Sequence, residues 1–181
     1  MSFLFLRKLF LTSILSLLTL FSPANSNTKV LKVGAIPDQN QELLDKRFNL
    51  FSKELTKSLG YEVKYTPVIN YVAAVTGFRL GDLDLVWFGG LSGVQARLQT
   101  PNAIIIAQRD IDKEFKSVFI VNKKLKFDPI SSVKGLKKLR NLRFTFGSEN
   151  STSGRLMPEY FLNKAGIKIK NLKGGKAGFS G

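Results

Sequence analysis

The 181-residue sequence contains no cysteine and no histidine. Without cysteine, the chain forms no disulfide bond and lacks the lipid-carrying cysteine of a bacterial lipoprotein. Without histidine, it lacks the most common general base and zinc ligand, and it cannot form a Ser-His or Cys-His catalytic pair. We therefore expect a protein that is not an enzyme and that uses no metal and no cofactor.

Acidic residues are scarce compared with basic ones, 13 against 28, which gives a formal net charge of +15. The excess is concentrated in residues 115–181, where only Asp128, Glu149 and Glu159 accompany 15 lysines and arginines. A basic region attracts anions such as phosphate, nucleic acid or lipid headgroups. The alternative interpretation is a lysine-rich surface that faces water.

Long apolar runs are missing except at residues 9–21, where the run is 13 residues long and follows two basic residues. A membrane-spanning helix needs about 20 apolar residues. Ala24 and Ser26 supply the small residues of a cleavage site, so residues 1–26 fit a signal peptide better than a permanent anchor. We expect cleavage after Ser26 and a periplasmic product, and export makes nucleic acid an improbable partner.

Helix and strand patterns alternate in the first half of the chain. Apolar positions three and four apart predict helices, and short apolar runs predict strands. The predicted helices cover residues 41–59, 71–80 and 92–98, and the predicted strands cover 30–36, 61–65, 83–88 and 103–107. This alternation predicts an α/β lobe over residues 27–110, with a mainly parallel sheet covered by helices on both faces.

A polar, charged stretch around residues 108–114 separates this lobe from a second α/β unit over residues 111–181. The second unit has predicted strands at 117–121 and 142–146 and predicted helices at 132–139 and 153–165. Pro158 lies inside the last of these helices and should kink or restart it, because proline lacks the N–H that continues the helical hydrogen bonding.

Four hydroxyl side chains crowd the stretch between Gly147 and Gly154, where a predicted strand ends and a helix begins. They belong to Ser148, Ser151, Thr152 and Ser153. Hydroxyls donate hydrogen bonds without adding charge, and the free N–H groups at a helix start point at any anion bound there. The stretch therefore predicts an oxyanion-binding turn, and the alternative is an ordinary helix cap, which needs only one hydroxyl.

Aromatic residues mark two further candidate positions. Tyr71 begins a predicted helix, where its ring and hydroxyl can face the crevice at the strand ends of an open sheet, although it can also be a core aromatic. Trp87 and Ser92 lie in a glycine-rich segment that lets the backbone approach a ligand. We take all three as candidate ligand-binding residues.

Several of these stretches, taken together and in this order, resemble one protein family. They are Val33–Pro37, Asn70–Val75, Gly81–Gly90, Gln108–Asp110 and Phe146–Gly154. The sequence resembles the phosphate/phosphite/phosphonate substrate-binding proteins of ABC transporters, a family that includes a branch described as selenate binders.

The resemblance implies a type II periplasmic binding fold of two lobes with an oxyanion between them. It implies that the hydroxyls of Ser148, Ser151, Thr152 and Ser153 grip the oxyanion, that Tyr71 contacts it and that the segment from Trp87 to Ser92 lines the cleft. The function implied is capture of a phosphonate, phosphite, phosphate or selenate for an ABC permease in the inner membrane. We expect the protein to act as a monomer.

Members of that family continue past position 181, so the second lobe is expected to be incomplete. The first lobe is expected to lack its closing elements and to expose apolar sheet surface. Two other function classes stay open at this stage. Type II lobes also serve as ligand-sensing domains of regulators, and the hydroxyl-rich turn would suit an enzyme acting on phosphorylated substrates. The export signal argues against the first, and the missing histidine argues against the second.

Overall fold

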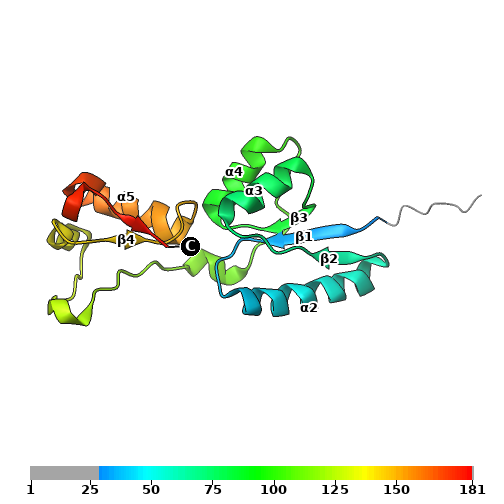
Figure 1. Ribbon diagram of the computed structural model, residues 1–181, viewed down its shortest axis with the longest axis horizontal. Helices are drawn as coiled ribbons and strands as arrows, with labels where there is room; N and C mark the ends of the chain where they lie inside the picture. Colours follow the sequence, from blue (N-terminus) through cyan, green and yellow to red (C-terminus); the bar gives the residue numbers. More distant parts are fainter. Residues whose placement is uncertain (1–28, 181) are drawn as a thin grey trace, which may run out of the picture.

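The computed structural model describes residues 29–180, so the predicted signal peptide over residues 1–26 lies outside the described residues. Two lobes lie side by side along the longest axis of the molecule (Figure 1). The first lobe is built around a parallel sheet of three strands, and the second around a parallel pair of short strands.

The sheet of the first lobe consists of β1 (Leu31–Ala35), β2 (Val63–Tyr65) and β3 (Leu85–Trp87), in the order β2-β1-β3. Each outer strand pairs with β1 in parallel, with Val33 opposite both Tyr65 and Leu85. Val33 and Ala35 are buried because β1 occupies the middle of the sheet. The predicted parallel α/β lobe is confirmed.

Three helices cover this sheet: α2 (Gln41–Leu59), α3 (Tyr71–Leu80) and α4 (Gly90–Gln99). Helix α2 lies on one face, and α3 and α4 pack together on the other (Figure 1). The parallel connections require helices between the strands, and these helices bury the apolar strands on both faces.

Local capping fixes where these helices begin and end. The side chain of Asn40 accepts a hydrogen bond from the N–H of Glu42 at 2.9 Å, and that of Asn70 accepts one from Ala73 at 2.8 Å. Gly60 and Gly81 follow the last residues of α2 and α3 with φ of 74° and 79°, a conformation that glycine adopts without strain. The predicted bounds of both helices are confirmed.

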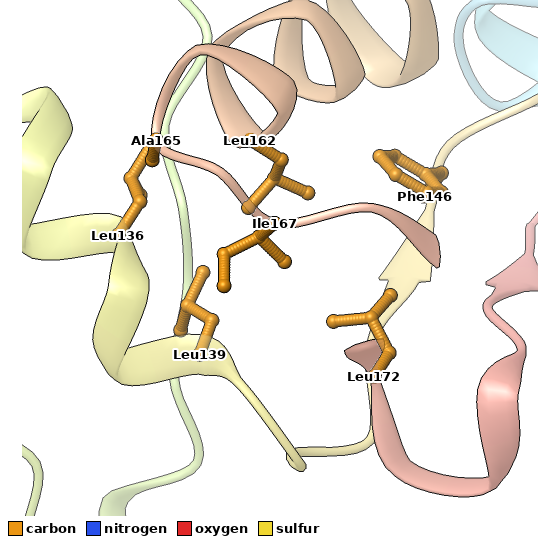
Figure 2. Close-up of a cluster of buried hydrophobic side chains, with 7 residues drawn as sticks. All are labelled: Leu136, Leu139, Phe146, Leu162, Ala165, Ile167 and Leu172. Atoms are coloured by element: carbon orange, nitrogen blue, oxygen red, sulfur yellow. The ribbon is translucent and has the colours of Figure 1, made fainter. Parts of the chain in front are cut away.

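The second lobe contains η4 (Val133–Leu139), β4 (Thr145–Phe146), η5 (Thr152–Leu156), α5 (Met157–Lys164) and β5 (Gly178–Phe179). Its remaining 3-10 turns are η6 (Ile169–Asn171) and η7 (Lys173–Gly175), while η2 (Asp110–Glu114) and η3 (Lys123–Leu125) belong to the segment between the lobes. Figure 2 shows its core, formed by Leu136, Leu139, Phe146, Leu162, Ala165, Ile167 and Leu172.

The sequence patterns of the second lobe were less accurate guides to structure. Residues 133–139 form a 3-10 helix rather than an α-helix, and the strand predicted over 142–146 is paired only at Thr145 and Phe146. The last predicted helix begins as a π turn, and a regular α-helix starts at Met157. Pro158 lies in the first turn of that helix, so the predicted restart is confirmed.

The strands predicted over residues 103–107 and 117–121 do not form. Both segments are extended and pair with no strand within residues 29–180, which leaves Ile104 77% exposed, Val118 78% and Ile120 91%. A strand gains stability from pairing and from burial of its apolar side chains. The prediction of strands over these two runs was wrong, because neither run has a strand beside it within residues 29–180.

Candidate functional site

The hydroxyl-rich turn joins β4 to α5 and is closed by two glycines. The N–H of Gly147 donates to the carbonyl of Gly154 at 2.8 Å. A Cβ atom on either glycine would lie 3.0 Å from the Cα of the other, tighter than nearly all real Cβ contacts. The two backbones therefore touch, and glycine is needed at both positions.

Ser151 begins the π turn η5 as its N-cap. Its hydroxyl accepts a hydrogen bond from the N–H of Gly154 at 3.0 Å, and its carbonyl accepts from the N–H groups of Arg155 and Leu156 at 3.2 and 3.1 Å. A single π turn at the start of an α-helix is uncommon and often marks a functional site. The wider turn sets Ser151 and Thr152 apart from the regular geometry of α5.

Thr152 reaches across to the first lobe. The N–H of Leu91, in the first turn of α4, donates to the Thr152 hydroxyl oxygen at 2.7 Å. A Cβ atom at Gly90 would lie 3.2 Å from that oxygen, so the bare backbone at this position makes the approach possible. Residues 61 positions apart are thus brought into contact at the boundary between the lobes.

The hydroxyls of Ser151 and Thr152 share one chemical property. Each accepts a hydrogen bond from a backbone N–H, at 3.0 and 2.7 Å respectively. A hydroxyl has one O–H donor besides its two acceptor lone pairs. Thr152 therefore keeps its O–H to donate, as an oxyanion requires, whereas the Ser151 hydroxyl also hydrogen-bonds the phenol of Tyr71.

Tyr71 stands beside this turn from the other lobe. Its ring is 8% exposed and packs in a core cluster with Ile36 and Ala74. Burial raises the pKa of its phenol, while the hydroxyl of Ser151 acts in the opposite direction and the Asp38 carboxylate raises the pKa further. The two interpretations of Tyr71 are compatible, because its ring belongs to the core and its hydroxyl lies near Ser151.

Trp87, at the end of β3, is half-buried, and the guanidinium of Arg109 packs against its ring. The guanidinium carbon of Arg109 lies 4.9 Å from the ring centroid, within the range of a cation–π contact. Asp112 fixes that guanidinium through a 2.7 Å ion pair. The same pairing, through a side-chain hydrogen bond, raises the pKa of Arg109 and lowers that of Asp112.

Asp38 follows β1 at the same end of the sheet. The residue is exposed as a whole, yet partial burial of its carboxyl raises the pKa, and the nearby Arg109 and Arg47 act against that rise. Sequence analysis assigned no role to Asp38 or Arg109, although Asp38 directly follows one stretch that carries the family resemblance and Arg109 lies in another. The signal available was their place directly after buried apolar strand patterns, where parallel strands open onto a crevice.

Ser92 is placed differently from the other predicted residues. It is fully buried, and its hydroxyl accepts from the N–H of Gly89 at 3.1 Å and lies 3.2 Å from the Gly89 carbonyl. Both hydrogen-bonding capacities are thus used to cap α4. This placement favours a role in holding the start of α4 rather than direct contact with a ligand.

Ser148 and Ser153 lie within the turn and are half-buried. The carbonyl of Ser148 accepts from the N–H of Ser151 at 2.9 Å, and the carbonyl of Ser153 accepts from the hydroxyl of Ser117 at 2.8 Å. The structure therefore brings together Tyr71, Ser148, Ser151, Thr152 and Ser153, with Trp87 at the strand end nearby.

Neither a metal site nor a membrane span is found in the part of the chain that the structure describes. Within residues 29–180, no cluster of three or more acidic side chains could hold a metal ion. Over the same residues, no helix has the length and apolar character needed to cross a membrane.

With this geometry established, comparison with known proteins identifies the family. The sequence model of the family described as "ABC transporter, phosphonate, periplasmic substrate-binding protein" matches residues 33–181. The chain belongs to this family. The family resemblance and the type II binding fold expected from the sequence are confirmed.

Two curated relatives illustrate the match. The chain is 78% identical over 175 residues, 96% of its length, to the probable ABC transporter phosphite binding protein PhnD1 of Prochlorococcus marinus (strain MIT 9301). It is 34% identical over 83% of its length to the phosphonates-binding periplasmic protein of Escherichia coli (strain K12). It spans 59% of the first relative and 45% of the second.

A solved structure supports the fold directly. The structure of PhnD1 from Prochlorococcus marinus (MIT 9301) in complex with methylphosphonate matches with a TM-score of 0.83 and 82% sequence identity. The match covers 86% of this chain and 57% of that one. The part of the relative that has no counterpart here is therefore about two fifths of its length.

Proposed function

We propose that this chain contributes the oxyanion-binding cleft of a periplasmic substrate-binding protein that delivers phosphonate or phosphite to an ABC importer. The observation that carries the proposal is the pair of hydroxyls at Ser151 and Thr152. Each accepts a backbone N–H; the O–H of Thr152 has no hydrogen-bond partner within residues 29–180, and that of Ser151 lies beside the Tyr71 phenol. Two such donors, one of them fixed against the opposite lobe, suit a tetrahedral oxyanion that must be held between lobes.

The choice of phosphorus oxyanions follows from the relatives. One relative is described as a phosphite binding protein, one as a phosphonates-binding protein, and the solved PhnD1 structure holds methylphosphonate. The broader set expected from the sequence also included phosphate and selenate. The proposal is limited to phosphonate and phosphite, and the other two serve as competitors in its test.

Several parts of the proposal rest on sequence alone. The pattern of residues 1–26 supports export to the periplasm, and the import role implies a permease as partner. We also propose that the protein acts as a monomer. The alternatives of a regulator domain or an enzyme gain no support from the relatives, which are described as binding proteins.

Calorimetric titration tests the proposal. The protein is recovered from the periplasm of an expression host, where its mass also shows whether cleavage occurs after Ser26. It is titrated with methylphosphonate, phosphite, phosphate and selenate. A second protein, in which the C-terminal two fifths of the Prochlorococcus relative follow residue 181, supplies the length that the relatives have.

We expect the extended protein to bind methylphosphonate or phosphite at micromolar or lower concentration. The Thr152→Ala variant should bind about 10- to 100-fold more weakly, because a hydrogen bond to a charged group contributes about 1.5–3 kcal/mol. The matched control Thr152→Ser keeps the hydroxyl and should retain most of the affinity. Failure of the extended protein to bind any of the four anions would contradict the proposal.

A further inference from the structure

The two lobes meet at a second point beside the oxyanion-binding turn. The side-chain amide of Gln95 donates to the side-chain carbonyl of Asn150 at 3.2 Å. Gln95 lies on α4, one helical turn after Leu91, whose N–H donates to Thr152. The first turns of α4 thus hold the turn at two places, Asn150 and Thr152, which flank Ser151.

The Gln95–Asn150 contact differs in kind from the Leu91–Thr152 contact. The Thr152 hydroxyl accepts from a backbone N–H, that of Leu91, and still carries an O–H. The Asn150 side-chain oxygen accepts from another side chain, the Gln95 amide one helical turn further along α4. Both side chains are half-buried. Their hydrogen bond joins residues 55 positions apart, one in each lobe.

We infer that Gln95 and Asn150 form a latch that stabilises the closed arrangement of the lobes without touching the ligand. This inference rests on the proposed function in one respect only: closure matters to the protein because an oxyanion lies between the lobes. The latch holds the closed state, and the hydroxyls of Ser151 and Thr152 recognise the anion. The two tasks are carried by neighbouring residues in one turn.

A latch of this kind has a distinct thermodynamic signature. When only the closed state binds tightly, the apparent dissociation constant equals the intrinsic constant divided by the closed fraction. Removing a bond that exists only in the closed state lowers that fraction by the same factor for every ligand. A residue that contacts the ligand behaves differently, because its loss affects ligands of different shape or charge by different factors.

Lobe closure can be measured without ligand. The sequence has no cysteine, so cysteines introduced at the exposed positions Lys53 and Lys170 are the only labelling sites. Lys53 lies on α2 of the first lobe and Lys170 in η6 of the second. The distance distribution between two spin labels at these positions then reports the closed fraction of the ligand-free protein.

The variants are Gln95→Ala, Asn150→Ala and the double variant, each in the full chain and in the chain extended with the relative's C-terminal part. Gln99→Ala is the matched control, because Gln99 is the same residue type on the same helix, one turn further and exposed. We expect either latch variant to shift the distribution toward longer distances, with no added effect in the double variant. The control should leave it unchanged.

Binding supplies the second measurement. We expect each latch variant to weaken methylphosphonate and phosphite binding by the same factor, about 3- to 10-fold, as expected for the loss of one neutral hydrogen bond. The ratio of the two dissociation constants should stay within twofold of the parent. Pairing Gln95→Lys with Asn150→Asp should restore affinity by replacing the amide bond with an ion pair.

The outcomes separate the two proposals. If the parent binds neither anion, the proposed function is wrong, while the distance distributions still decide the latch. If the latch variants leave the ligand-free distribution unchanged, the latch is wrong whatever the ligand. If they change the ratio of the two dissociation constants, Gln95 and Asn150 act on the ligand itself, which also overturns the latch.

Discussion

The first lobe and the segment that leads from it to the second lobe carry the same kind of sequence but differ in structure. In the first lobe, short apolar runs became β1, β2 and β3, because each has a strand beside it and a helix over it. The runs at residues 103–107 and 117–121 are equally apolar and stay exposed. A strand forms only when a second segment pairs with it. An apolar run alone therefore does not predict a strand.

The two exposed runs, residues 103–107 and 117–121, follow α4 and lie on either side of η2. The chain spans about three fifths of the PhnD1 sequence it matches. Ile104, Val118 and Ile120 present apolar side chains to water. Four predictions follow this contrast, from the largest expected effect to the smallest.

Hydrogen exchange should separate the two regions most strongly. Amides of β1 are hydrogen-bonded to both neighbouring strands and should exchange at least about a thousandfold more slowly than those of residues 103–107 and 117–121. In the protein extended with the relative's C-terminal part, the two exposed runs should gain protection. Equal exchange of all three segments in the unextended chain would show that the contrast is absent in solution.

Shortening one buried and one exposed apolar side chain to alanine tests the same difference in burial. Leu162 is 2% exposed in the core drawn in Figure 2, so Leu162→Ala should lower the free energy of unfolding by about 2–5 kcal/mol. Ile120→Ala removes an apolar side chain that is 91% exposed and should change it by less than about 0.5 kcal/mol. Denaturant titration measures both. A large effect of Ile120→Ala would mean that this run is buried in solution.

Helix capping gives a smaller effect confined to the first lobe. Asn70→Ala removes the side-chain acceptor of the Ala73 N–H and should cost about 1 kcal/mol in the free energy of unfolding. Asn70→Asp keeps an acceptor oxygen and is the matched control. Thermal unfolding of both variants checks this, and an Ala variant as stable as the parent would show that the cap contributes nothing to α3.

The pH dependence of stability should show the smallest effect. Burial raises the pKa of Asp38 in the folded chain, so the folded state binds protons more tightly than the unfolded state there. Stability from this group is present below its unfolded pKa and is lost as pH rises through the folded pKa. Asp38→Asn should therefore be relatively more stable at pH 7 than at pH 3, by less than about 0.5 kcal/mol because the residue is exposed. Equal effects at both pH values would contradict it.

Part of the site could be read from the sequence and part could not. The crowding of hydroxyls between Gly147 and Gly154 was visible, because four donors exceed what a helix cap needs. Which hydroxyls remain free to donate was not visible. The Ser92 hydroxyl uses its hydrogen bonds to cap its own helix, whereas the Thr152 hydroxyl accepts from a backbone N–H of the other lobe. Those partners depend on how the lobes meet, and that is a contact between distant segments.

The basic residues show the same division. Composition indicates an excess of positive charge in residues 115–181, yet Arg109, whose guanidinium lies over the Trp87 ring, precedes that region. Its place is set by the ring of Trp87 and the carboxylate of Asp112. Net charge describes the field around the chain, whereas the position of one guanidinium depends on what it packs against.

The sequence by itself determined the local events of this fold: where α2 and α3 begin and end, the restart of α5 near Pro158, and the parallel α/β character of the first lobe. These follow from caps, proline and periodicity, which act over a few residues. The tertiary structure alone decided which apolar runs became strands, which hydroxyls kept a free donor, and where Gln95 meets Asn150. Each of these depends on a contact between segments that are distant in the sequence, and a local sequence pattern does not predict such a contact.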